Sequence, residues 1–167
     1  MCSTGLRPER ALTMCLRLYI ATRERLPSVT KTKAAPYLDI EEVRDPKVAR
    51  GRFGTDRPFL YVAGGHVECG CGFPAVGADT ISNHKIPEEA DLKSMNALAI
   101  HLRNACRGHS TVELYLCWIH EESETPTSRR TVTLGDLRDP SFRLRHREVL
   151  TVGSGPSNKQ MQRTRRG

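Results

Sequence analysis

The chain has 167 residues, of which 38% are hydrophobic and 27% are charged, and its formal net charge is +7. This composition is ordinary for a soluble protein of one domain, with a core large enough to fold without disulfides. It excludes a membrane-spanning helix, because no apolar run reaches the ~20 residues that such a helix needs.

The positive charge is concentrated at the C-terminal end of the chain. Residues 153–167 contain no acidic side chain and four basic ones: Lys159, Arg163, Arg165 and Arg166. The segment 14–152 lacks the basic stripe with interleaved aromatic residues that marks a nucleic-acid surface. We therefore expect neither specific nucleic-acid binding nor a membrane partner, and we expect 153–167 to form a disordered basic tail.

An apolar segment at 11–21 follows two arginines, as in a secretory signal peptide. Arg17 interrupts this segment and no small-residue cleavage pattern follows before Arg23, so we predict a cytoplasmic protein. In a reducing compartment, six cysteines are expected as free thiols rather than as three disulfides. Because 1–13 lack periodicity, we expect a single domain over 14–152 with 1–13 as an extension.

Alternating apolar residues predict the first strand. In 15–22, Leu16, Leu18 and Ile20 face one way and the residues between them face the other, which is typical of a half-buried strand. Four elements follow in chain order: a proline-punctuated loop over 23–36, a short strand over 37–43, one helical turn over 45–53 and a more central strand over 58–65.

The most regular pattern in the chain is helical. Apolar residues recur at helical spacing from Pro87 to Arg107, and Gly108 suits the C-terminal cap. The strands expected after this helix cover 111–119, 131–134 and 142–152. Strands around one helix predict an α+β fold. We expect a single domain with a mixed or mainly antiparallel sheet and one main helix over about 87–107.

Two of the predicted strands have mirrored patterns, C-L-R-L-Y at 15–19 and E-L-Y-L-C at 113–117. If they pair antiparallel, Cys15 lies opposite Cys117, and one face of the sheet carries polar, aromatic and thiol side chains. Such a face forms the floor of a pocket or is covered by the loop that follows the strand at 58–65.

That loop, GGHVECGCGF at 64–73, combines glycines with one histidine and two cysteines. Its glycines permit left-handed backbone, which lets Cys69 and Cys71 converge, and His66 is close enough in sequence to join them. Thiolates and imidazole are the ligands that zinc prefers. The first hypothesis is therefore a binding or structural module for a zinc-like ion. Two strand cysteines would complete the set if the sheet brings them under the loop: Cys15 and Cys117.

Two alternatives use the same residues. A thiol-dependent enzyme or redox protein would use Cys69 or Cys71 as the reactive thiol, with His66 stabilising the thiolate. Loop amides would then form an anion-binding nest. In the other alternative the cysteines are structural core residues and the protein has a partner-binding role. The sequence leaves these alternatives open.

Three segments occur in order along the chain: MCLRLYIAT (14–22), FLYVAGGHVECGCGF (59–73) and VELYLCW (112–118). In these segments, and over about 14–152, the chain resembles a family of small uncharacterised bacterial proteins that begin with Met-Cys. The resemblance implies a start at Met14 and no particular activity. It marks six motif positions: His66, Cys69, Cys71, Cys15, Cys117 and Trp118. The tail SNKQMQRTRRG resembles translated read-through of the recombination site that borders integron gene cassettes, which implies a mobile gene.

Overall fold

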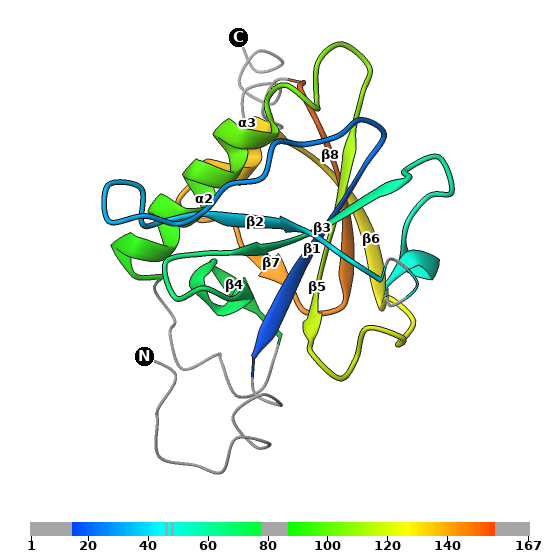
Figure 1. The fold of residues 1–167 in the computed structure, drawn as a ribbon, viewed down its shortest axis with the longest axis horizontal. Helices are drawn as coiled ribbons and strands as arrows, with labels where there is room; N and C mark the ends of the chain where they lie inside the picture. Colours follow the sequence, from blue (N-terminus) through cyan, green and yellow to red (C-terminus); the bar gives the residue numbers. More distant parts are fainter. Residues whose placement is uncertain (1–14, 46, 48, 78–86, 156–167) are drawn as a thin grey trace, which may run out of the picture.

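The computed structural model describes residues 15–45, 47, 49–77 and 87–155. Its strands in the main sheet are β1 (Leu16–Thr22), β2 (Asp39–Glu42), β3 (Phe59–Gly64), β5 (Val112–Trp118), β6 (Ser128–Thr133) and β8 (Glu148–Gly153). They form one six-stranded sheet in the order β2-β3-β1-β5-β8-β6 (Figure 1). Only β6 and β8 run parallel, and the other neighbours are antiparallel. The predicted α+β fold with a mainly antiparallel sheet is confirmed.

Six shorter or helical elements surround this sheet. They are η1 (Arg50–Arg52), η2 (Gly70–Gly72), β4 (Ala75–Val76), α2 (Glu89–Leu102), α3 (Leu134–Leu137) and β7 (Leu144–Arg145), of which β4 and β7 pair in parallel. None of the helices in the described part of the chain is long and apolar enough to cross a membrane. The predicted extension 1–13 and residues 156–167 of the predicted tail lie outside the described residues.

The main helix is shorter than the sequence pattern suggested. It begins with a capping box, in which Glu88 and Asp91 satisfy each other's backbone N–H groups, and it ends at Leu102 instead of near 107. The chain beyond it turns repeatedly, and the backbone N–H of Cys106 still bonds the Leu102 carbonyl at 3.1 Å. Cys106 thus reaches the core through a turn, and Gly108, at φ +60, lies in these turns and does not cap the helix.

Both faces of the central strand β1 are buried. On one face, Leu18 and Ile20 join a core cluster with Leu98 of α2. On the other face, Tyr19 packs in a second cluster with Phe53, which directly follows η1. Figure 1 shows α2 and η1 toward opposite sides of the sheet. The strand was predicted to be half-buried. Its second face is buried as well, because the segment around Phe53 packs on that face, and this tertiary contact is not visible in the local sequence pattern.

The predicted antiparallel pairing of β1 with β5 is correct, but the predicted register is wrong by two residues. Arg17 lies opposite Cys117, and Tyr19 lies opposite Tyr115. Cys15 is placed next to Ile119, whose backbone N–H donates to the Cys15 carbonyl at 3.1 Å. A shift of two residues keeps every side chain on its face, so the alternating pattern specifies the faces but not the register.

Candidate thiol site at the start of the first strand

The loop after β3 folds back onto the start of β1, where Cys71 lies in η2 and Cys69 is the N-cap residue of η2. A Cβ atom on Gly70 would lie 2.9 Å from the Leu16 carbonyl oxygen and 3.0 Å from the Leu18 nitrogen. Real Cβ atoms do not approach backbone atoms this closely, so only glycine lets the loop backbone lie directly on the strand. Gly72 meets the backbone of Gly65 in the same way, with 2.9 Å from a Cβ atom to the Gly65 Cα.

The sequence predicted a different reason for these glycines. Left-handed backbone was expected at Gly70 and Gly72, but among the described residues of the loop the positive φ belongs to Glu68, at 64°. The two thiols converge because η2 makes one tight turn, and the Gly72 N–H closes it on the Cys69 carbonyl at 3.1 Å. The glycines are needed for close packing rather than for an unusual backbone conformation.

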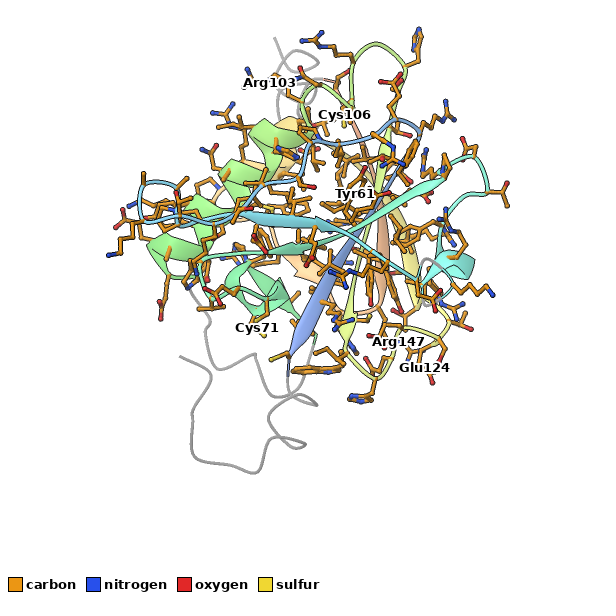
Figure 2. All side chains as sticks on the ribbon, viewed as in Figure 1. Tyr61, Cys71, Arg103, Cys106, Glu124 and Arg147 are labelled. Atoms are coloured by element: carbon orange, nitrogen blue, oxygen red, sulfur yellow. The ribbon has the colours of Figure 1, made fainter. Side chains whose placement is uncertain are left out.

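Cys71 forms hydrogen bonds with both the start of β1 and the other loop cysteine. The backbone N–H of Leu16 donates to Cys71 Sγ at 3.3 Å. The backbone N–H of Cys71 donates to Cys69 Sγ at 3.4 Å. The interaction between the two thiols also shifts the pKa of both, lowering that of Cys71 and raising that of Cys69. Figure 2 labels Cys71 beside the start of β1, at the other end of the molecule from Cys106. Cys69 and Cys71 therefore form one partly buried thiol pair.

The pair favours a thiolate on Cys71. The hydrogen bond from the Cys69 thiol is the main cause that lowers the pKa of Cys71 from 9.0 to about 6; burial opposes it, and the Leu16 N–H adds to it. The same hydrogen bond, together with burial and the charge on Cys71, raises the pKa of Cys69. At neutral pH the pair thus shares a single proton, and the negative charge lies on Cys71.

The other described cysteines divide into one that lies near the pair and two that do not. Cys15 lines the same cleft as Cys69 and contributes to the raised pKa of Cys69. Cys117 is fully buried among the tyrosines of the second core cluster, and burial raises its pKa to about 12. Burial likewise raises the pKa of Cys106 to about 11. Cys117, which the sequence placed in the site, is thus a core residue.

His66 is held by the main helix. Its backbone N–H donates to Ser94 Oγ at 3.0 Å, and its Nδ1 lies 3.6 Å from Asp91 Oδ1. No hydrogen bond joins its ring to either loop cysteine in the part of the chain that the structure describes. The sequence proposed His66 as the group that stabilises a thiolate, and the Leu16 N–H and the Cys69 thiol take this place instead.

The described residues do not gather the predicted zinc ligands into one set. Among residues 15–77 and 87–155, apart from 46 and 48, no three histidine, cysteine, aspartate or glutamate side chains form a group that could hold a metal ion. Cys117 belongs to the second core cluster and His66 is bound to α2. The residues present therefore do not fit a zinc ion without rearrangement, since a structural zinc site needs four ligands.

A cleft of about 570 Å³ opens beside Cys15 and Cys69, and Cys71 is not part of its lining. Its volume is that of a small-molecule site. Its lining comes from the start of β1, from β2 and β3, and from the loop: Cys15, Leu16, Arg17, Asp39, Glu41, Glu42, Val43, Arg44, Val62, Gly64, Glu68, Cys69, Gly70 and Ile119. The sequence did not single out the β2 side chains, because only the sheet order brings this edge strand near the loop.

Comparison with protein-family models, with curated proteins and with solved structures finds no match to this chain. The resemblance to a bacterial family stays a prediction, as does the origin of the tail. The function is therefore argued from the site alone.

Proposed function

We propose that the chain is a thiol–disulfide redox protein in which Cys69 and Cys71 cycle between a dithiol and a disulfide. The observation that supports this most is the environment of Cys71 Sγ, which accepts a hydrogen bond from the Leu16 N–H at 3.3 Å. The neighbouring Cys69 thiol, as a hydrogen-bond donor, lowers the pKa of Cys71 further. Donors of this kind stabilise the thiolate, which is the reactive form of cysteine. A second thiol in direct contact supplies the partner that a redox couple needs.

The first step is attack by the Cys71 thiolate on one sulfur of a substrate disulfide, R–S–S–R. A bond forms between Cys71 Sγ and that sulfur, the S–S bond of the substrate breaks, and R–S⁻ leaves with the electron pair. The Leu16 N–H holds the attacking sulfur in place until this bond forms. The products of the step are a mixed disulfide on Cys71 and one released thiolate.

Cys69 then acts as the resolving thiol. While Cys71 is charged, its hydrogen bond and its charge raise the pKa of Cys69, so the proton stays on Cys69. The mixed disulfide removes that charge, and Cys69 gives its proton to the released thiolate and attacks Cys71 Sγ. The Cys69–Cys71 bond forms and the second R–S⁻ leaves and takes a proton from water. Two protein thiols are oxidised, and one disulfide is reduced to two thiols.

The disulfide that results closes a very small ring, because only Gly70 separates the two cysteines. Small rings force disulfides away from their preferred geometry, and strained disulfides have more oxidising potentials. The oxidised form is thus readily reduced again. This property suits a couple that cycles and does not suit a permanent cross-link.

Two single variants test this proposal. In Cys69→Ser the resolving thiol is gone, so Cys71 treated with the neutral 2-hydroxyethyl disulfide should retain a stable mixed disulfide. In Cys71→Ser, Cys69 should react no faster than an ordinary cysteine. Cys106 and Cys117 are buried internal controls that should stay unmodified in the folded protein. The proposal fails if Cys71 of Cys69→Ser reacts no faster than the same cysteine in the unfolded chain.

Zinc binding, the first hypothesis from the sequence, is the second candidate function. Cys15 and Cys69 line the same cleft, but a zinc site there would require the cysteines to move together and a fourth ligand to join them. Metal analysis of protein purified without a histidine tag separates the candidates. One zinc per chain that protects Cys69 and Cys71 from alkylation favours the zinc site, and metal-free protein with a reactive Cys71 favours the redox pair.

A further inference from the structure

The backbone turn that leads into the thiol pair contains a strained residue. Two hydrogen bonds close this turn: the Glu68 N–H donates to the Gly65 carbonyl at 3.0 Å, and the Gly65 N–H donates to the Cys69 carbonyl at 3.0 Å. Glu68 has a φ of 64°, in the left-handed region that glycine ordinarily occupies in turns. A strained residue of this kind persists only where neighbouring contacts hold it. Because Cys69 follows directly, the conformation of Glu68 sets where the Cys69 side chain lies.

The side chain of Lys31 makes two contacts with this turn. Its Nζ donates to the His66 carbonyl at 2.7 Å and lies 3.0 Å from Glu68 Oε1. The lysine side chain is 22% exposed, whereas that of Glu68 is 74% exposed. An ion pair with so exposed a carboxylate contributes little by itself, so the bond to the backbone carbonyl is the stronger contact. One ammonium group therefore holds the turn at two of its residues.

Lys31 is itself fixed at the edge of the sheet. Its backbone N–H donates to Oδ1 of Asp39, the first residue of β2, at 3.2 Å. Two residues earlier, Val29 exchanges two backbone hydrogen bonds with Ile40 of β2, at 3.0 and 2.8 Å. The chain around Lys31 thus has a defined position, and its ammonium group reaches the turn from a rigid strand.

The main helix holds the same turn independently of Lys31. The His66 N–H donates at 3.0 Å to Oγ of Ser94, which is fully buried in α2. This bond remains when the lysine side chain is replaced, so the turn stays attached to the helix. Loss of Lys31 is therefore expected to release Glu68 from its strained conformation without unfolding the loop.

We propose that Lys31 is a positioning residue for the thiol pair, which keeps Glu68 in the left-handed conformation and thereby places Cys69 against Cys71. The inference rests on the proposed function, because it concerns the resolving step, in which Cys69 attacks Cys71 Sγ and the substrate thiolate leaves with the electron pair. Such a step is fast only when the two reacting atoms are held close together and in line. Lys31 acts on it through the backbone of the turn.

The lifetime of the mixed disulfide tests the inference. The protein is mixed with excess 2-hydroxyethyl disulfide, quenched with acid at intervals and digested with pepsin, and the peptide that carries Cys69 and Cys71 is weighed. In Lys31→Met the mixed disulfide on Cys71 should last roughly ten-fold longer than in the wild type. Lys31→Arg keeps a cation with N–H donors and should restore most of the wild-type rate. Lys33→Met is the matched control, because Lys33 is an exposed lysine of the same loop, and it should match the wild type.

A second variant tests the link through Glu68. Glycine adopts a positive φ without strain, so Lys31→Met combined with Glu68→Gly should return to the wild-type lifetime. This double variant also removes the ammonium group without leaving a strained residue behind. Equal lifetimes in the wild type and in Lys31→Met, or an increase that Glu68→Gly does not reverse, would overturn the inference and leave the redox function intact. A wild-type chain that never forms the Cys69–Cys71 disulfide would overturn the redox function and this inference with it.

Discussion

The backbone N–H of Leu16 donates a hydrogen bond to Cys71 Sγ at 3.3 Å, across 55 positions of sequence. Leu16 is the first residue of β1 and lies before Leu18, where the pairing of β1 with β3 begins, so β3 does not take its N–H. Two neighbouring residues support this bond. Gly70 lets the loop backbone lie directly on the strand, and the Cys69 thiol lowers the pKa of Cys71. The proposed site therefore requires the start of the central strand as much as it requires the loop.

The first prediction concerns the hydrogen bond between the two thiols. Cys69→Ala removes the donor that contributes most to the low pKa of Cys71, so this pKa should rise from about 6 toward 9.0. Cys69→Ser is the matched variant, because a hydroxyl group still donates to the thiolate and should preserve most of the effect. The rate of alkylation of Cys71 as a function of pH measures both. An unchanged midpoint in Cys69→Ala would show that the thiol pair does not share a proton.

The second prediction concerns the contact between the loop and β1. In Gly70→Ala the added Cβ would lie 2.9 Å from the Leu16 carbonyl oxygen, so η2 must move away from the strand. We expect the free energy of unfolding to fall by about 1–3 kcal/mol and the pKa of Cys71 to rise, because the Leu16 hydrogen bond lengthens. Gly51→Ala is the control, since a Cβ there meets no atom within 4 Å. Equal stability of the two variants, in denaturant unfolding, would contradict the close packing.

The third prediction is a pH dependence of stability. The pKa of Cys71 is about 6 in the folded chain and 9.0 for an ordinary cysteine, so between these values the unfolded chain binds more protons. Stability therefore rises with pH in this window. The raised pKa of Cys69 acts in the opposite direction above pH 9. Relative to Cys71→Ser, the wild-type free energy of unfolding should increase from pH 6 to 9. A difference that stays constant over this range would exclude a thiolate on Cys71.

The fourth prediction separates Cys117 from the site. Because its side chain is fully buried in the second core cluster, Cys117→Ala should lower the free energy of unfolding by about 1 kcal/mol. It should leave the alkylation rate of Cys71 and the oxidation of the thiol pair unchanged. Thermal unfolding and alkylation of the same preparation provide the two measurements. Slower oxidation of the pair in Cys117→Ala would contradict this prediction and show that Cys117 takes part in the site.

The fifth prediction concerns a buried ion pair away from the site. Arg57 and Glu113 are 5% and 8% exposed, and Arg57 Nε lies 3.3 Å from Glu113 Oε2. Arg57→Met should lower the free energy of unfolding by roughly 3 kcal/mol, because it leaves the Glu113 carboxylate buried with the Gly54 N–H as its one donor among the described residues. Adding Glu113→Leu should recover part of this loss. Denaturant unfolding of the single and double variants measures both changes in the free energy of unfolding. A double variant that is no more stable than Arg57→Met would contradict the prediction.

The sequence was sufficient for the main helix and for the faces of the central strands, but it did not predict α3 or the division of 142–152 into β7 and β8. Alternation placed Leu18 on one face of β1 and Tyr19 on the other, as observed. It was not sufficient for the register of β1 against β5, since a slip of two residues changes no face. With that slip Cys117 lies opposite Arg17, and Cys15 lies opposite Ile119.

The candidate site was predicted in part. The combination of glycines with Cys69 and Cys71 pointed to the correct loop, but the role of His66 was assigned by its distance along the chain. Its partner, Asp91, belongs to the first turn of α2, and no local pattern reveals that contact. The Leu16 N–H carries no signal in the sequence, because any residue at the start of β1 would present the same backbone donor.

The most direct test of the account is a redox equilibrium of the thiol pair. The tryptic peptide 53–85 contains Cys69 and Cys71 and no other cysteine, so its mass reports their state directly. The protein is equilibrated with graded ratios of oxidised and reduced dithiothreitol, quenched with acid, alkylated and digested. The account predicts one two-electron transition in which this peptide loses two hydrogens and cannot be alkylated. A peptide that stays a doubly alkylated dithiol at every ratio, or that forms disulfides only with other chains, would contradict it.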